Sequence, residues 1–132
     1  MAKSFRVGPI LTILVLVVII YTVYVNSIDD QAQPLLKIGI PEAKSRRFGL
    51  IIDVRTPKER EQLGYYPNSI PISVQTLEQQ VPLDIANKNT WILVYCNSGQ
   101  RSKQAAEILY RMGYKNVRYI TESYLSLMPG SK

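Results

Sequence analysis

The sequence has one cysteine, Cys96, and no histidine among its 132 residues. The absence of histidine excludes an imidazole general base and histidine metal ligands, and a single cysteine cannot form an intramolecular disulfide. A cysteine thiolate is therefore the strongest nucleophile that this chain offers, and we expect no metal site. With no imidazole beside it, the thiol must be activated by its surroundings.

Cys96 is followed by a polar segment that favours the charged form of its thiol. A tight turn at Gly99 directs successive backbone N–H groups inward, and a helix that begins after it adds its N-terminal partial positive charge. Arg101 adds a full positive charge nearby. The alternative is an inert cysteine that packs as a small hydrophobic residue. The candidate binding residues around the thiolate are Asn97, Ser98, Gly99, Gln100, Arg101 and Ser102.

An alternation of strands and helices positions this segment. Apolar, β-branched or aromatic runs predict strands at 50–54, 91–95 and 117–120. Composition and spacing predict helices at 57–63, 76–80 and 102–112. Thr56 is a candidate N-cap, and Gly64 and Gly113 are candidate stops. The pattern predicts an α/β layered domain with a central, mainly parallel sheet flanked by helices, in which ligands bind beyond the carboxyl ends of the strands.

Residues 7–25 form an apolar stretch without a charged side chain. As a helix they would reach roughly 28 Å, which matches the ~30 Å hydrocarbon core of a bilayer. We therefore expect one N-terminal transmembrane helix in contact with the lipid bilayer. A cleavable signal peptide is one alternative, because residues 1–6 are basic and small residues follow Val25; a buried core helix is another.

The flanks of this stretch predict its orientation. Lys3 and Arg6 precede it, whereas Asp29 and Asp30 follow it, so the positive-inside rule keeps the N-terminus in the cytosol. We expect a single-pass membrane protein whose catalytic domain lies on the extracytoplasmic side. Cys96 would be a free thiol in an oxidising compartment there.

The rest of the chain is long enough for one modest core. Residues 26–34 predict a polar tether, residues 35–128 the domain, and residues 129–132 a tail. Lys and Arg number 16 against 10 Asp and Glu, a net charge of +6. Because the basic residues are scattered rather than clustered, this excess favours anionic partners without indicating nucleic acid.

The segment from about Leu35 to Leu127 resembles a single-domain rhodanese, a sulfurtransferase. The resemblance rests on residues 53–55 (Asp-Val-Arg), 96–102 (Cys-Asn-Ser-Gly-Gln-Arg-Ser) and 113–117 (Gly-Tyr-Lys-Asn-Val), with Glu59 in the helix after the first of these. It implies a rhodanese-like fold in which Cys96 accepts sulfur from a donor, holds it as a persulfide in a cradle of loop amides, and yields it to an acceptor. No metal or organic cofactor is implied.

The same resemblance implies partners and supporting residues. The donor would be a small sulfur-containing anion such as thiosulfate, and the acceptor a thiol or a cyanide-like group. Arg101 would help to hold the donor, unless it points outward. Arg55 would pair with a carboxylate near the site, and Asp53 and Arg55 are possible supporting residues.

Spacing separates this family from cysteine-based phosphatases and arsenate reductases, its nearest rivals. Those enzymes place five residues between the cysteine and the arginine, whereas four separate Cys96 from Arg101. Tyrosine phosphatases also have a histidine before the cysteine, where this chain has Tyr95. The spacing favours sulfur transfer.

Two segments depart from the rhodanese pattern. Gly64 to Ile70 lacks the histidine that the family usually has there, and residues 121–124 (Thr-Glu-Ser-Tyr) replace its usual Gly-Gly pair and tryptophan. Both segments shape the mouth of the site in the family. The alternatives to an enzyme are a membrane-tethered interaction module with a rhodanese-like fold and a redox sensor that uses the thiol.

Overall fold

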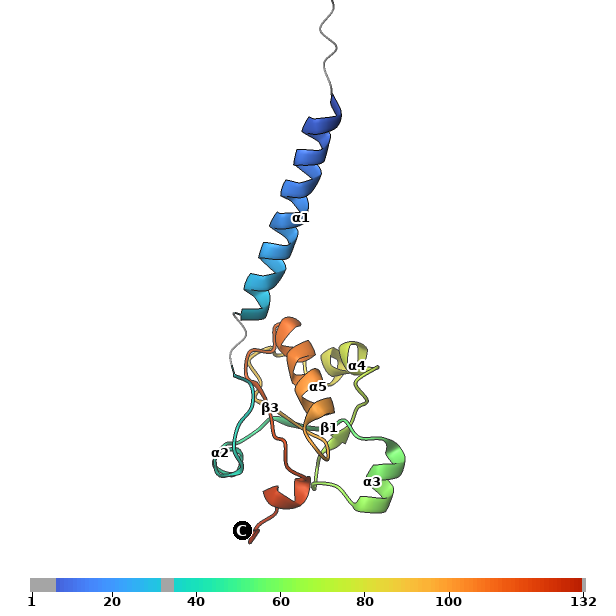
Figure 1. The fold of residues 1–132 in the computed structure, drawn as a ribbon. Helices are drawn as coiled ribbons and strands as arrows, with labels where there is room; N and C mark the ends of the chain where they lie inside the picture. Colours follow the sequence, from blue (N-terminus) through green and yellow to red (C-terminus); the bar gives the residue numbers. More distant parts are fainter. Residues whose placement is uncertain (1–6, 32–34, 132) are drawn as a thin grey trace, which may run out of the picture. The chain divides into compact units, whose positions relative to one another are not determined.

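The structure is a computed structural model that describes residues 7–31 and 35–131. By its internal contacts the chain divides into two compact units, one ending at Leu35 and the other beginning at Leu36. The first unit contains one helix, α1 (Val7–Gln31), and the second contains the remaining elements (Figure 1).

Helix α1 is apolar and long enough to cross a membrane over Val7–Ser27, and none of that span is buried. A signal sequence meets the same criteria at this end of a chain. The expected helix ends at Val25, but α1 continues to Gln31 through part of the segment expected to be a tether. Polar residues 26–31 include no glycine or proline to stop it. The expected basic flank, 1–6, and the end of the tether, 32–34, lie outside the described residues.

The second unit is built on a four-stranded sheet in the order β2-β1-β3-β4, with every neighbouring pair parallel. Its strands are β1 (Leu50–Asp53), β2 (Ile70–Pro71), β3 (Ile92–Tyr95) and β4 (Val117–Tyr119). The register places Leu50 opposite Ile92 and Asp53 opposite Tyr95. The expected α/β fold with a parallel sheet flanked by helices is confirmed.

The two faces of the sheet carry separate apolar clusters because side chains alternate along each strand. Ile52 and Val94 face the cluster that includes α4 (Leu77–Asp84) and α5 (Gln100–Arg111). Leu93 and Ile51 face the cluster that includes α2 (Ile40–Ser45) and the 3₁₀ turn η1 (Tyr124–Leu127). Figure 1 shows α4 and α5 together, well away from α2. The second face is therefore covered by much shorter elements than the first.

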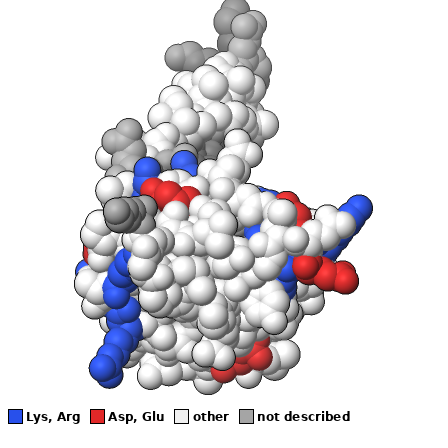
Figure 2. All heavy atoms as spheres, turned by 90° about the horizontal axis from the view of Figure 1, so that it is seen from below, with Lys and Arg blue, Asp and Glu red and all other residues white. Residues whose placement is uncertain are grey.

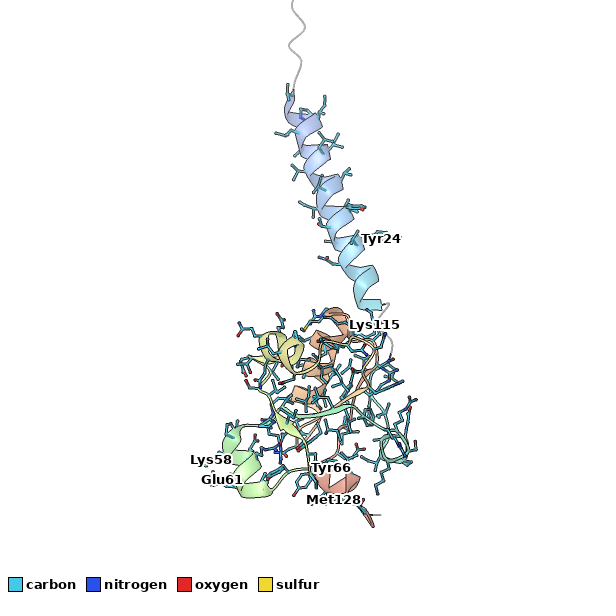
Figure 3. The ribbon with its side chains drawn as sticks, turned by 180° about the vertical axis from the view of Figure 1, so that it is seen from behind. Tyr24, Lys58, Glu61, Tyr66, Lys115 and Met128 are labelled. Carbon is cyan, nitrogen blue, oxygen red and sulfur yellow. The ribbon has the colours of Figure 1, made fainter. Side chains whose placement is uncertain are left out.

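Helix α3 (Pro57–Leu63) has the bounds that the sequence predicts. The Glu59 N–H donates to the Thr56 side chain and the Glu59 carboxylate accepts from the Thr56 N–H, which completes a capping box. Gly64 ends the helix with a φ of 74°, a conformation that favours glycine. Figure 3 shows Lys58 and Glu61 on the outer side of α3.

Other boundaries differ from the sequence predictions. Helix α4 runs to Asp84 instead of ending near Gln80, and it contains Pro82. Helix α5 starts at Gln100, two residues earlier than expected, and each predicted strand is one residue shorter in the structure. Helix α2, strand β2 and the turn η1 were not predicted from the sequence.

The charged side chains of the domain are dispersed in the view of Figure 2. Lysine and arginine side chains project separately from a largely uncharged surface, and acidic side chains lie among them. This face therefore lacks the continuous positively charged surface that binds the phosphate backbone of a nucleic acid.

Candidate active site

Cys96 directly follows β3, at the carboxyl edge of the sheet, and is 1% exposed. The chain turns back over the sulfur at Gly99, whose φ is 95° and whose N–H donates to Cys96 Sγ at 3.0 Å. A Cβ at Gly99 would lie within 2.9 Å of the Thr121 backbone, a separation too short for van der Waals contact. The turn thus needs glycine both for its conformation and for its close approach to the segment after β4.

The surroundings of the sulfur favour the thiolate. Burial raises the pKa of the Cys96 thiol, but hydrogen bonds from the Ser102 hydroxyl and from the N–H groups of Ser102, Gly99 and Ser98 outweigh it and hold the pKa below its ordinary value. These donors fit the amide cradle that the sequence predicts. These donors stabilise the thiolate through their dipoles, so no neighbouring base is involved.

Among the described residues, Ser102 is the one side chain that hydrogen-bonds to the sulfur, and it accepts from the Cys96 thiol. It is fully buried, and its Oγ lies 3.4 Å from Cys96 Sγ, 3.1 Å from the Gly99 carbonyl oxygen and 3.0 Å from the Ile120 carbonyl oxygen. A hydroxyl has one hydrogen. The Ser102 hydroxyl must therefore turn from a carbonyl to the sulfur when the thiol loses its proton.

Arg101 is held by a carboxylate from another element. Its guanidinium donates to both Glu59 oxygens, at 2.8 and 2.9 Å, and this pair lowers the pKa of Glu59 to about 2. Asn97 donates to the same carboxylate at 3.3 Å. The resemblance implies that Arg101 helps to hold the donor anion unless it points outward; in the structure a bidentate ion pair with Glu59 occupies its guanidinium.

A buried ion pair lies next to this loop. Arg55 donates to both oxygens of Asp53, each at 2.9 Å, and their side chains are 1% and 0% exposed. Arg55 also donates to the Gly64 carbonyl at 2.6 Å and to Asn97 Oδ1 at 3.3 Å. The expected pairing of Arg55 with a nearby carboxylate is therefore present, and the contacts of Arg55 tie β1, the end of α3 and the loop after β3 together.

Asp53 has further partners that the sequence analysis missed. Burial raises its pKa, but the bonds from Arg55 and from the Tyr95 hydroxyl, at 3.1 Å, outweigh it and keep the pKa below its ordinary value. Arg60 donates to Asp53 at 3.2 Å and to the Ser69 hydroxyl at 3.0 Å. No spacing in the sequence joins Arg60, Ser69 and Tyr95, because they come from α3, from the loop before β2 and from β3.

Two of the other loop side chains face outward. Ser98 and Gln100 are exposed, whereas Asn97 is half-buried against Arg55 and Glu59. A groove of about 390 Å³ adjoins the loop and has Arg101, Gln104, Thr56 and Gln75 among its lining residues. Within residues 7–31 and 35–131, no group of three or more acidic, histidine or cysteine side chains is placed to hold a metal ion.

Comparison with known proteins places this arrangement in a family context. Residues 29–127 match the rhodanese-like domain family. The chain is 38% identical over 66 residues to thiosulfate sulfurtransferase PspE of Escherichia coli (strain K12), an alignment that covers 50% of this chain and 62% of that protein. It is 36% identical over 87 residues to a putative mitochondrial thiosulfate sulfurtransferase of Schizosaccharomyces pombe, covering 58% and 61%. The chain thus spans about three fifths of the length of these two relatives.

A solved structure agrees with these sequence matches. A rhodanese with anions from E. coli superposes with a TM-score of 0.51 at 31% identity, over 61% of this chain and 91% of that one. The superposition covers nearly the whole of that protein.

Proposed function

The chain belongs to the rhodanese-like domain family, and we propose that it is a membrane-anchored sulfurtransferase that carries sulfur on Cys96. The observation that carries this proposal is the loop after β3, where the Gly99 N–H lies 3.0 Å from a buried sulfur whose pKa is lowered by its surroundings. A thiolate held by inward-facing dipoles is a nucleophile that needs no base.

The proposed reaction proceeds in two displacements. The Cys96 thiolate attacks the sulfane sulfur of a donor such as thiosulfate, a bond forms between the two sulfurs, and the bond to the sulfite group breaks. Sulfite leaves with the electron pair, and Cys96 becomes an anionic persulfide. A thiolate or cyanide acceptor then attacks the outer sulfur and forms a bond to it. The bond between the two sulfurs of the persulfide breaks, and Cys96 leaves as a thiolate. The cycle requires no metal, organic cofactor or external oxidant.

The charges around the loop support an anionic donor. Three guanidinium groups, those of Arg55, Arg60 and Arg101, face two carboxylates, those of Asp53 and Glu59. The one positive charge left over offsets the negative charge of the Cys96 thiolate or persulfide. The site is therefore close to neutral, so a small anion meets no net repulsion there although each arginine is bonded to a carboxylate of the protein.

Helix α1 supports the anchor. It is apolar over Val7–Ser27, and the cations Lys3 and Arg6 precede it in the sequence while Asp29 and Asp30 follow it. By the positive-inside rule the N-terminus would stay in the cytosol, and residues 35–128 would carry out sulfur transfer on the extracytoplasmic side.

The test is the intact mass of the full chain in detergent, measured before and after thiosulfate and again after cyanide. We expect a gain of one sulfur atom that cyanide removes, and no gain in Cys96→Ser. Ser98→Ala is the matched control, because its side chain is exposed and its N–H remains. If neither thiosulfate nor a persulfide donor adds sulfur to Cys96, the proposal of a sulfurtransferase is wrong, and the alternative of an interaction module with this fold replaces it.

A further inference from the structure

A second hollow, of about 570 Å³, lies on the face of the sheet that α2 and η1 cover. Ile51 and Leu93 form its floor and are direct neighbours in the register of β1 and β3. Helix α2 has six residues and η1 has four, and these elements leave Ile51 partly exposed although it belongs to a central strand. None of residues 96–102 lines this hollow, so it is separate from the candidate active site.

The walls of the hollow are aromatic and aliphatic. Phe48 and Tyr66 are half-buried side chains that line it, together with Leu127 and Pro129. A hollow of this volume with an apolar floor and two aromatic rings falls within the roughly 300–1,000 Å³ range of small-molecule sites.

The rim of the hollow is positively charged. Lys44, Arg46 and Arg47 line it, and none of the described residues that line it is acidic. Lys44 donates to the Ser131 carbonyl and hydroxyl oxygens, and Arg46 pairs with Glu42 at 2.8 Å. Arg47 is exposed, and no hydrogen bond or ion pair to another described residue satisfies its guanidinium. The rim therefore presents a guanidinium to an anion at the mouth of an apolar site.

We propose that this hollow binds an aryl anion, a flat apolar body that carries one carboxylate, sulfonate or phosphate group. The apolar body lies over Ile51 and Leu93 between Phe48 and Tyr66, and the anionic group pairs with Arg47. Burial of the body supplies affinity, and the rim selects the charge. This site is independent of sulfur transfer at Cys96.

The probe is naphthalene-2-sulfonate, titrated into the full chain in phosphatidylcholine nanodiscs and followed by ligand-detected NMR, with empty nanodiscs as the blank. Its neutral counterpart, naphthalene-2-sulfonamide, keeps the apolar body without the charge. Arg47→Gln removes the proposed partner. Arg111→Gln is the matched control, since it removes an exposed arginine at the end of α5. Cys96→Ser tests whether the hollow is separate from the catalytic loop.

We expect saturable binding of the sulfonate that Arg47→Gln weakens about fivefold and that added salt also weakens. The sulfonamide should bind the unmodified protein no more tightly than the sulfonate binds the Arg47→Gln variant. Arg111→Gln and Cys96→Ser should bind as the unmodified protein does. The proposal is overturned by the absence of saturable binding, by equal binding of sulfonate and sulfonamide, by an equal loss in the two arginine variants, or by a loss in Cys96→Ser.

Discussion

Replacing Ser102 with alanine should raise the pKa of the Cys96 thiol by about one unit. A hydrogen bond to a charged group contributes about 1.5–3 kcal/mol, and the 3.4 Å separation of Ser102 Oγ from Cys96 Sγ places this bond at the weak end. Loss of about 1.4 kcal/mol of thiolate stabilisation corresponds to one pH unit. The N–H donors of the loop remain in the variant, so the shift should not be larger.

The assay is the rate of alkylation of Cys96 by iodoacetamide as a function of pH. Only the thiolate reacts, so the midpoint of the rate profile reports the pKa. Below both midpoints, Ser102→Ala should react up to about tenfold more slowly than the unmodified protein, and the two rates should converge at high pH. Ser98→Ala, which keeps its N–H, should show the unmodified profile.

A second readout separates this effect from misfolding. Ser102→Ala also removes the hydroxyl that donates to the Ile120 carbonyl oxygen, which costs about 1–3 kcal/mol in the free energy of unfolding, whereas the Gly99 carbonyl oxygen keeps the Lys103 N–H. Urea denaturation should show this loss with an unchanged m-value. A variant that loses this stability but keeps the unmodified alkylation midpoint would refute the role of the Ser102 hydroxyl as a donor to the thiolate.

Three further variants test the ion pairs and the turn. Asp53→Asn leaves Arg55 buried without its carboxylate, so denaturant unfolding should show a loss of about 3–5 kcal/mol. Gly99→Ala should abolish sulfur loading and lower the melting temperature because a Cβ cannot fit there, whereas Gly39→Ala, which has room, should change neither; equal effects would contradict the geometry. Glu59→Gln should lower the melting temperature near pH 6. The pKa of Glu59 is about 2 in the folded state against an ordinary 4.5, so the ionised carboxylate stabilises the fold fully above pH 4.5. This stabilisation is lost as the pH falls towards 2, and the melting temperatures of the two proteins should converge there.

The sequence predicted the parts of the fold that depend on neighbours in the chain. Thr56 and Gly64 fix the ends of α3 through local hydrogen bonds and backbone conformation, and both were identified from residue type. The full length of α4 was not predicted, because Pro82 resembles a stop. Strand β2 was not predicted, because it has only two residues, one of them Pro71, and is defined only by its pairing with β1.

The same distinction applies to the candidate site. The loop from Cys96 to Ser102 is one continuous segment, so residue types and spacing were sufficient to select it. The pairing of Arg101 with Glu59 joins residues 42 positions apart, and nothing in either local sequence indicates that this arginine is already bound. Similarly, Asp53 was named as a possible supporting residue, but its contact with Arg60 was not predicted. Side-chain partners that meet only through the sheet are not visible in a single sequence.

The absence of histidine is consistent with the proposed chemistry. In acyl or phosphoryl transfer a base must take a proton from the nucleophile or an acid must protonate the leaving group. In the proposed cycle Cys96 enters as a thiolate, and both leaving groups, sulfite and the Cys96 thiolate, depart as stable anions. What the site must supply is a favourable environment for negative charge on sulfur. The N–H groups around Gly99 and the Ser102 hydroxyl supply it, and Glu59 and Asp53 hold the nearby arginines, so fixed dipoles of the loop rather than a titrating side chain set the reactivity of the cysteine.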